Sequence, residues 1–389
     1  MKKLKKGSKI LIANDSLGIT GVQTYVSKTA EHLEKMGYKV VRLEPSDKDF
    51  FTLPAYKDFN WTVFATPIVT RKLLQEKPDA ILITTIEAPI GTATKNVCEF
   101  LEVSRYCKSC PYTASYTTDH GMFVKKLLEQ SLVGSISSRI DIAKKIENKV
   151  VDFSETQFLR SKYYGAKRIM VNAKSSKEKL EKMKLRNVEI SRRGIDAFQF
   201  HLPTKEDENP YEQYDWYREK KLPILIYLGR VAYEKDIQLF LEGDLPKYHR
   251  VVAGDGPAMD HLKSISKGKK NIHFVGKVDY SKVKNYFQYA RVTFFPSSFD
   301  TFGQTIVESA ACGTPVVGFN VQGPKDVIKE GVMGVIVPSN TSLFEGLPKA
   351  LKINRKKCSR YTHKSFSWKR ATEELLGNLY QIKWRKGLA

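Results

Sequence analysis

Two carboxylates, Asp300 and Glu308, flank the glycine-bearing segment 302–304. The apolar run 292–295 predicts a buried strand before this segment, and residues 306–311 predict a helix after it. The segment therefore lies at a strand-to-helix junction, where backbone amides and the helix dipole favour a phosphate. Carboxylates suit sugar hydroxyls, which are weak donors that need strong acceptors. Together they indicate a nucleotide sugar, although an isolated pair at this spacing is also typical of an acidic loop before a capped helix.

A pair of cations follows another short apolar strand. Residues 224–228 lead into Gly229, and Arg230 and Lys235 come soon after it. The planar guanidinium of arginine can form two parallel hydrogen bonds to phosphate oxygens, and a lysine ammonium adds a point charge. At the carboxyl end of a strand, this pair is suited to neutralise a leaving diphosphate without a metal ion. Any single pair of this kind is also common on protein surfaces.

Glycines follow two further apolar strands. Residues 251–253 lead into a turn with Gly256, and the first strand of the chain leads into a loop with Gly18 and Gly21, followed by Val22. Ligands of open α/β sheets bind outside the carboxyl ends of the strands, so both turns are candidates for ligand contact. The first loop lacks the three-glycine fingerprint of dinucleotide-binding folds, and its glycines alone are a weak signal.

These four motifs occur in an order and at spacings that resemble the family-four retaining glycosyltransferases of the GT-B fold, over nearly the whole chain. Asp-Thr-Phe-Gly at 300–303 replaces the commoner Glu-Gly-Phe-Gly and is similar to the branch with sulfolipid synthases and diacylglycerol or phosphoinositide sugar transferases. Further segments that match this branch are 87–91, 191–196, 323–326 and 366–368. The resemblance implies an α/β protein with two doubly wound Rossmann-like domains facing a central cleft.

The resemblance also implies roles for the residues at these motifs. Arg230 and Lys235 would hold the donor diphosphate, Glu308 the ribose hydroxyls, and Asp300 with neighbouring amides the transferred sugar. The residues expected at the donor are Gly18, Gly21, Val22, Gly229, Gly256, Phe302, Gly303, Gln304 and Glu308. The expected donor carries UDP in preference to GDP, and the reaction is expected to need no cofactor and no metal ion.

One departure from the family concerns a histidine that contacts the sugar. Where the family usually has Tyr/Phe-His-Thr, this chain has Tyr116-Thr117-Thr118-Asp119-His120. Thr117, Asp119 and His120, alone or in combination, are the candidates to replace that histidine, and we assign the last two to the catalytic set. A histidine beside an aspartate is also typical of a structural hydrogen-bonded pair.

The length of 389 residues exceeds what one core usually supports, and strand and helix patterns alternate in both halves of the chain. We expect an N-terminal acceptor-side domain at 1–200, a polar linker at 201–221 and a nucleotide-sugar domain at 222–367. By resemblance, a helix at 368–389 packs back on the first domain. The expected strands are 9–13, 39–43, 80–84, 112–116, 152–155, 168–171, 223–228, 249–253, 272–275, 292–295, 316–319 and 334–337.

Cysteine usage and hydropathy bear on the compartment. Five cysteines at irregular spacings argue against a disulfide framework and for a reducing compartment. Cys107-Lys-Ser-Cys110 has the spacing of zinc and redox sites, but a single such pair is weak evidence for either. No apolar run reaches the ~18 residues of a spanning helix, and the lysine-rich start lacks the apolar region of a secretion signal. We expect a cytoplasmic protein, either free or peripheral at a membrane.

The net charge of +23 and isoelectric point near 9.6 are high for an enzyme that handles only sugar nucleotides. Residues 1–200 contain 35 Lys and Arg against 22 Asp and Glu, and residues 351–389 contain 11 against 2, so we expect the excess on the acceptor side. Such a surface favours the phosphates of an anionic membrane or of duplex DNA, with plain solubility charge as the alternative. The residues expected to bind the acceptor are Lys144, Lys145 and Lys149.

Together these features predict a retaining, metal-independent glycosyltransferase that moves a hexose from a nucleoside diphosphate sugar to a hydroxyl acceptor. A glycolipid or another anionic acceptor at a membrane is favoured, with docking through an amphipathic helix such as 122–133 or 59–64. One alternative is a DNA glycosyltransferase that modifies hydroxymethylated bases, which requires access to a base inside the duplex. A more distant alternative is a sugar-nucleotide epimerase of the same fold.

Overall fold

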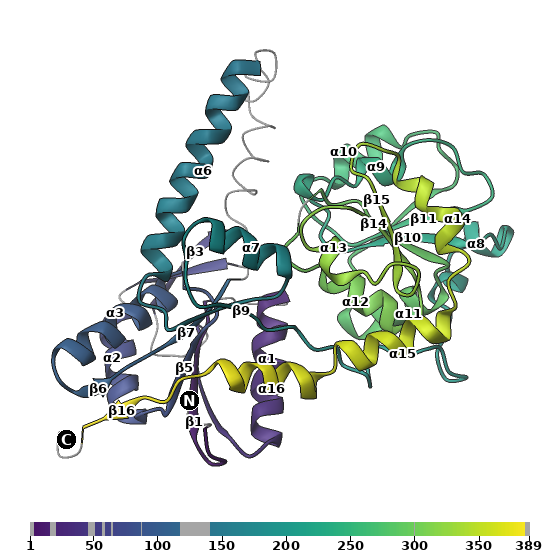
Figure 1. Ribbon diagram of the computed structural model, residues 1–389. Coiled ribbons are helices and arrows are strands. Elements are labelled where there is room, and N and C mark those ends of the chain that lie inside the picture. The colour runs from purple at the N-terminus through teal and green to yellow at the C-terminus, as the bar shows by residue number, and fades with distance from the viewer. Residues whose placement is uncertain are drawn as a thin grey trace. The chain divides into compact units, whose positions relative to one another are not determined.

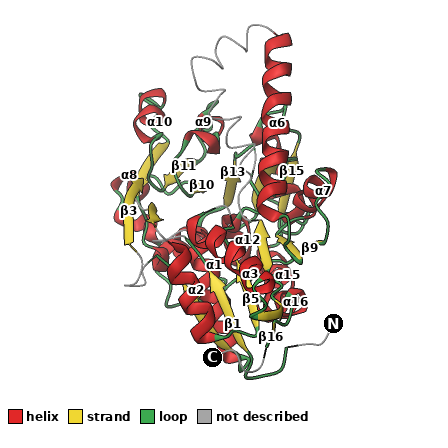
Figure 2. Cartoon of the chain, turned by 90° about the vertical axis from the view of Figure 1, so that its left-hand side faces the viewer, coloured by secondary structure: helices red, strands yellow, loops and turns green. Residues whose placement is uncertain are grey.

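The computed structural model describes residues 4–15, 21–45, 51–56, 59–63, 65–86, 88–116, 141–298 and 300–385. The chain forms two compact units and crosses between them twice. One unit consists of Met1–Gly194 and Trp368–Ala389, and the other of Ile195–Ser367. Each unit contains a β-sheet accompanied by α-helices (Figures 1 and 2). The predicted α/β fold class, with two doubly wound Rossmann-like domains, is confirmed.

The sheet of the first unit has six parallel strands in the order β2-β1-β5-β7-β8-β9. Two antiparallel pairs, β3 with β4 and β6 with β16, lie outside it. The elements of this unit are β1 (Lys9–Ala13), α1 (Gly21–Lys35), β2 (Lys39–Leu43), β3 (Phe51–Tyr56), β4 (Phe59–Val63), α2 (Ala65–Glu76), β5 (Ala80–Ile83), α3 (Pro89–Val103), β6 (Cys107–Ser109), β7 (Thr113–Tyr116), α6 (Asp141–Tyr163), β8 (Arg168–Val171), α7 (Lys174–Lys182), β9 (Val188–Ile190), α16 (Trp368–Asn378) and β16 (Lys383–Trp384).

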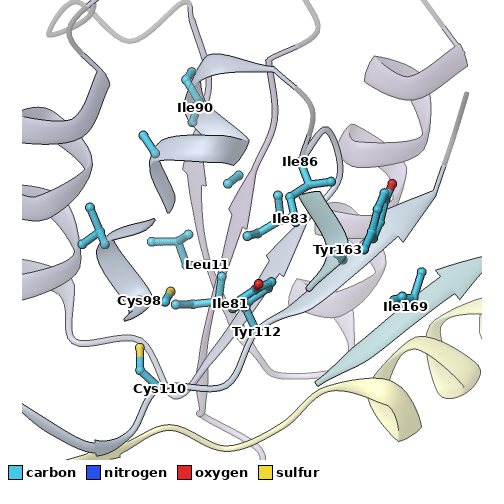
Figure 3. Close-up of a cluster of buried hydrophobic side chains, with 14 of the residues drawn as sticks. Leu11, Ile81, Ile83, Ile86, Ile90, Cys98, Cys110, Tyr112, Tyr163 and Ile169 are labelled. Atoms are coloured by element: carbon cyan, nitrogen blue, oxygen red, sulfur yellow. The ribbon is translucent and has the colours of Figure 1, made fainter. Parts of the chain in front are cut away.

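The main strands of this sheet are buried on both faces. Along β1, Leu11 belongs to one core cluster and its neighbour Ile12 to another, because successive side chains of a strand point to opposite faces. Figure 3 shows the first cluster, in which Leu11 and Ile81 of adjacent strands lie near Cys98 of α3. The apolar runs that predicted these strands therefore reflect helices packed on both sides.

Helix α16 covers part of the second face of this sheet. Trp368, Ala371 and Leu375 are buried at helical spacing and join the core cluster that contains Ile12. The Trp368 ring stacks on Tyr25 of α1, with ring centroids 6.3 Å apart. The last helix of the chain is thus part of the first unit, although the residues before it belong to the second.

Residues 152–155, expected as a strand, lie within helix α6, so this prediction is wrong. Val151, Glu155, Leu159 and Tyr163 are buried at intervals of four residues, which is the spacing of one helix face. The short apolar segment is therefore one side of a long helix. Figure 1 shows α6 as one long, continuous helix.

The two segments expected as docking helices have different outcomes. Residues 122–133 lie outside the described part of the chain. Residues 59–63 form strand β4, which pairs with β3 as an antiparallel hairpin, so the expected amphipathic helix at 59–64 is wrong. Aromatic and β-branched residues dominate β4, and both types favour strands.

The sheet of the second unit also has six parallel strands, in the order β12-β11-β10-β13-β14-β15. The elements of this unit are η1 (Pro210–Gln213), α8 (Asp215–Glu219), β10 (Ile224–Leu228), η2 (Tyr233–Lys235), α9 (Gln238–Leu241), β11 (His249–Ala253), α10 (Met259–Ile265), β12 (Ile272–Gly276), η3 (Tyr280–Lys282), α11 (Val283–Tyr289), β13 (Val292–Phe295), α12 (Gln304–Ala311), β14 (Val316–Phe319), α13 (Pro324–Val327), β15 (Gly334–Val337), η4 (Leu343–Gly346), α14 (Leu347–Ala350) and α15 (Arg355–Ser365).

Residues 201–221, expected as a linker, lie in the second unit. Tyr211 is fully buried there, and its hydroxyl donates a hydrogen bond to the carbonyl oxygen of Tyr286 at 2.9 Å. Most polar residues of the segment lie at exposed positions, but the side chain of Asp207 is buried and pairs with Lys284 at 2.7 Å. The aromatic residues of the segment that pack on the core are Tyr211, Trp216 and Tyr217.

Strand order reverses once in each sheet, and ligands of such folds bind at the carboxyl ends of the strands beside the reversal. In the first unit the reversal lies between β1 and β5, and in the second between β10 and β13. The fold therefore offers one candidate site in each unit.

Candidate functional site

The strand reversal of the second unit brings together the loops that follow β10 and β13. The first loop carries Arg230 and Lys235, and the second carries Asp300. The Lys235 ammonium lies 2.9 Å from Oδ2 of Asp300. Sixty-five residues separate the two in the chain, so the fold and not local sequence creates this ion pair. Two of the predicted site residues are thus in direct contact.

Asp300 also organises its own loop. Its Oδ1 accepts hydrogen bonds from the backbone amides of Phe302 and Gly303, each at 3.0 Å. Burial raises the pKa of Asp300, but the Lys235 ammonium and the two amides outweigh burial and hold the pKa below its usual value. Asp300 is therefore an anion at neutral pH. The two amides expected to hold a sugar are engaged with this carboxylate, so a sugar must share or displace that contact.

Gly303 lets the chain turn from this loop into α12. Its φ is +81°, a conformation that residues with a side chain rarely adopt. A Cβ at this position would lie 2.6 Å from Cδ1 of Ile306. Gln304 is the first residue of α12, so the loop delivers its amides to the positive end of that helix.

The loops after β10 and β11 pack closely against each other. The amide of Gly229 donates to the carbonyl of Ala253 at 3.0 Å, and that of Val231 donates to the carbonyl of Asp255 at 2.9 Å. A Cβ on Gly256 would lie 2.3 Å from the carbonyl oxygen of Val231, so only glycine permits this approach. The predicted glycines therefore shape the loop that carries the cations.

Arg230 lies at the surface of the site. Its guanidinium is about half exposed and pairs with the carboxylate of Glu234. The hydroxyl of Tyr227 donates to the Arg230 carbonyl oxygen at 2.7 Å and anchors the backbone. Sequence reasoning missed Glu234, although its position four residues after Arg230 is a common spacing for an ion pair.

Asp236 is a second residue that sequence reasoning missed. It follows Lys235 with a positive φ of 50°, and its Oδ2 accepts a hydrogen bond from the amide of Ser298 at 3.1 Å. The contact ties the β10 loop to the β13 loop and so holds Lys235 toward Asp300. Only the position of an aspartate directly after Lys235 could have signalled this role.

Glu308 lies one turn into α12 and is 5% exposed. Burial raises its pKa to about 7, although hydrogen bonds from Gln304 and Tyr280 oppose the shift. Near neutral pH this carboxyl is divided between its ionised and protonated forms. A hydroxyl bound by Glu308 would therefore feel a change of pH around neutrality.

The residues predicted in the first unit are less completely described. Gly18, Asp119 and His120 lie outside the described residues. Gly21 is the first residue of α1, and Val22 packs against the core cluster below that helix. The acceptor lysines at 144, 145 and 149 lie on α6.

The strand reversal of the first unit carries a polar network that sequence reasoning did not assign. Asp15 follows β1 and is 2% exposed. Its carboxylate accepts hydrogen bonds from the amides of Ile90 and Gly91, at 2.7 and 2.9 Å, and from the hydroxyl of Thr85 at 3.1 Å. These amides belong to the first turn of α3, so a residue of the chain already binds at the positive end of this helix.

Two features are absent from the described part of the chain. Within the described ranges, no group of three or more His, Cys, Asp and Glu is arranged to hold a metal ion. In the same part of the chain, no helix is both long and apolar enough to cross a membrane. The site of the second unit contains two cations, the carboxyl groups of Glu234, Asp300 and Glu308, and a helix amino end. This combination is suited to an anionic ligand with hydroxyl groups.

Residues 213–367 match the family described as "Glycosyl transferases group 1". A GDP-mannose-dependent alpha-mannosyltransferase of Corynebacterium glutamicum is 23% identical and covers 82% of this chain and 73% of that protein. An alpha-monoglucosyldiacylglycerol synthase of Streptococcus pneumoniae is 29% identical and covers 41% of this chain and 38% of that protein. The match to the second protein thus spans less than half of its length.

Two solved structures share the fold across nearly the whole chain. Sucrose-phosphate synthase from Thermosynechococcus elongatus aligns with a TM-score of 0.69 at 16% identity, over 95% of this chain and 97% of that one. The Anabaena protein HepE in complex with UDP-glucose aligns with a TM-score of 0.64 at 13% identity, over 95% and 98%.

The chain shares the GT-B fold of known glycosyltransferases. Its second unit contains a segment of the group 1 glycosyl transferase family, and the resemblance drawn from the four motifs is confirmed.

Proposed function

We propose that the protein transfers a hexose from a nucleoside diphosphate sugar to a hydroxyl acceptor, with retention of configuration and without a metal ion. The observation that carries this proposal is the cluster of Arg230, Lys235 and Asp300 at the strand reversal of the second unit. This is the place where a doubly wound sheet binds its ligand, and it holds the charges that a diphosphate requires.

The cations supply the stabilisation of the leaving group. Each now faces one carboxylate, Glu234 for Arg230 and Asp300 for Lys235. A bound diphosphate brings more negative charge than either carboxylate, and both cations lie close enough to the surface to reach it. Negative charge grows on the diphosphate as the sugar leaves, so these cations stabilise the transition state more than the ground state. The phosphate that leaves also serves as the base for the incoming hydroxyl on the same face of the sugar.

We propose UDP as the nucleotide and Glu308 as the acceptor of its ribose hydroxyls. UDP is supported by the similarity in fold to HepE, which binds UDP-glucose. Glu308 lies on α12, whose amino end faces the Lys235–Asp300 pair, so ribose and diphosphate would be held by one helix. Asp300 would then accept hydroxyl groups of the transferred sugar.

For the acceptor we propose a glycolipid precursor or another anionic lipid at a membrane surface. The name of the streptococcal relative, a synthase of monoglucosyldiacylglycerol, supports a lipid. The net charge of +23 supports an anionic surface, because an attractive surface potential concentrates a cationic protein there. Transfer of the sugar to hydroxymethylated bases of duplex DNA is the alternative result that the test below can detect.

The test is transfer of radiolabelled sugar from a panel of UDP- and GDP-sugars. Each donor is offered vesicles that contain diacylglycerol and anionic phospholipid, and separately hydroxymethylated duplex DNA, with and without excess chelator. We expect label in the lipid fraction from a UDP-sugar, undiminished by chelator, and a product whose anomeric configuration equals that of the donor by NMR. Label on DNA alone, an inverted product, or activity that needs added Mg²⁺ or Mn²⁺ would each overturn the corresponding part of the proposal.

A further inference from the structure

The second unit contains a cavity of about 310 Å³ at a distance from the cation cluster. Part of its wall is Gly331 and Val332, just before β15, and the rest comes from the end of α14, the connection to α15 and the first turn of α15. All strands of this sheet are parallel, so their amino ends lie on one side of the sheet and their carboxyl ends on the other. The beginning of β15 therefore lies on the side opposite to the carboxyl ends of β10 and β13. The cavity is therefore separate from the candidate donor site.

Three lysines line this cavity, and no acidic residue does. The lining residues are Gly331, Val332, Lys349, Lys352, Ile353, Asn354 and Lys357. Within the described part of the chain, none of the three ammonium groups takes part in an ion pair. The sequence contains no Asp or Glu between Gly346 and Thr372, and the carboxylates nearest to the lining residues in the chain, Glu330 and Glu345, do not line the cavity. Glu330 instead accepts a hydrogen bond from the amide of Ile336 at 2.7 Å.

The wall that carries Lys357 is held firmly against the core. Arg355 donates to the carbonyl oxygen of Ala290 at 2.8 Å, and the Ser359 hydroxyl donates to that of Ala311 at 2.6 Å. With these side chains directed inward, Lys357 remains on the outer side of α15. Asn354 caps the same helix by accepting a hydrogen bond from the Lys357 amide at 3.0 Å. Contacts with the core therefore fix the part of the wall that carries Lys357.

Like charges repel, so a cavity lined by three lysines and no carboxylate is suited to an anion with several oxygens. We infer that this cavity binds the phosphate group of a ligand, such as a phosphorylated small molecule or a lipid headgroup, at a site distinct from the donor site. Ile353 and Val332 provide an apolar side to the cavity, against which the organic part of a phosphate ester packs. The positive charge of residues 351–389 was expected on the acceptor side, but residues up to Ser367 belong to the second unit.

Inorganic pyrophosphate is the probe for this site, titrated calorimetrically into the full chain with saturating UDP present so that the donor site is occupied. The test variant is Lys349→Ala/Lys352→Ala/Lys357→Ala, and the matched control is Lys356→Ala, an exposed lysine of α15 outside the cavity lining. Loss of several charge-assisted hydrogen bonds should weaken pyrophosphate by at least ~10-fold in the triple variant, with little change in the control.

A second arm distinguishes the two sources of phosphate. Cosedimentation with phosphatidylcholine vesicles that contain phosphatidylglycerol is measured for the same variants. A loss confined to pyrophosphate binding indicates a small phosphorylated ligand, and a loss of vesicle binding indicates a headgroup. If the triple variant binds both probes as the wild type does, or if Lys356→Ala weakens binding equally, the proposed site is wrong. Circular dichroism and the melting temperature show whether the triple variant remains folded.

Discussion

The two units have the same sheet topology but different residues at the strand reversal. Strand order reverses once in each sheet. At each reversal, an aspartate carboxylate accepts hydrogen bonds from two backbone amides at or beside the amino end of a helix. In the first unit Asp15 is buried and takes its third hydrogen bond from the Thr85 hydroxyl. In the second unit Asp300 remains partly exposed and takes its third contact from a cation, Lys235.

Because of this difference, the strand reversal of the first unit is already occupied by a residue of the chain, whereas that of the second unit is open to a ligand. Asp15 supplies negative charge to the end of α3 from within the chain, so an anionic ligand has nothing to gain there. Around Asp300 the loops add two cations near the surface, Lys235, which faces Asp300, and Arg230, which faces Glu234. Both cations are close enough to the surface to turn toward a diphosphate. A shared fold therefore does not imply a shared site, and we propose that the charges at the strand ends decide which unit binds the donor.

The largest expected effect comes from removing the cation that distinguishes the second unit. Lys235→Ala should lower turnover by at least ~100-fold, because comparable charge stabilisation in oxyanion sites is worth about 3–4 kcal/mol. Steady-state kinetics with the donor found by the transfer assay would measure it. Lys270→Ala, an exposed lysine elsewhere in the unit, serves as the control. A near-normal rate for Lys235→Ala would mean that the open site is not the donor site.

Asp15→Ala should have a large effect on stability and a small one on donor binding. It leaves the amides of Ile90 and Gly91 without their buried acceptor, which costs roughly 1–3 kcal/mol. Calorimetry should therefore show a lower melting temperature with unchanged affinity for UDP. Asp300→Ala should instead have a small effect on the melting temperature and a large effect on turnover. If Asp15→Ala abolished UDP binding and left stability intact, the two sites would have been interpreted the wrong way round.

Much of the second unit could be predicted from its sequence, since apolar strands that end in glycine, arginine or aspartate are local signals. The family resemblance assigned Lys235 and Asp300 to the donor, but their ion pair was not predicted, because the partners are far apart in the chain. Asp15 was missed for the same reason: its amide partners lie 75 and 76 residues away. Residues 152–155 of α6 were wrongly predicted as a strand, because the hydrophobic spacing within four residues cannot distinguish a strand from one face of a helix.

A smaller effect is expected at Glu308, where burial raises the pKa to about 7. Glu308→Gln should raise the donor KM more than it lowers kcat, because ribose contacts bind ground and transition states alike. In the wild type this KM should fall as pH rises through 7 and the carboxylate forms, and the variant should lack that dependence. Equal losses in kcat and kcat/KM at unchanged KM would contradict a ribose role.

The same shift predicts a dependence of stability on pH. The folded pKa of Glu308 lies above its ordinary value of 4.5, so the native state holds the proton more tightly than the unfolded state. Its contribution to stability is therefore fully present below about pH 4.5 and is lost as pH rises through 7. Between about pH 5 and pH 8 the melting temperature of Glu308→Gln should fall less than that of the wild type. Parallel curves would show that Glu308 does not titrate as proposed.

The smallest effect is expected from the lysines on α6. Lys144→Glu/Lys145→Glu/Lys149→Glu should weaken binding to anionic vesicles and flatten its dependence on salt, because fewer screened charges contribute. Hydrolysis of the donor without an acceptor should be unchanged, since the donor site belongs to the other unit. Unaltered vesicle binding and salt response would identify these lysines as general solubility charge.

The most direct test of the difference between the two units is calorimetric titration of UDP into the wild type and into Arg230→Ala/Lys235→Ala. With the open site in the second unit, the wild type binds UDP, and the double variant, folded and with an unchanged melting temperature, binds it at least ~100-fold more weakly through loss of two charge-assisted contacts. Equal affinity in the two proteins would contradict the assignment of the donor site to the loops after β10 and β13.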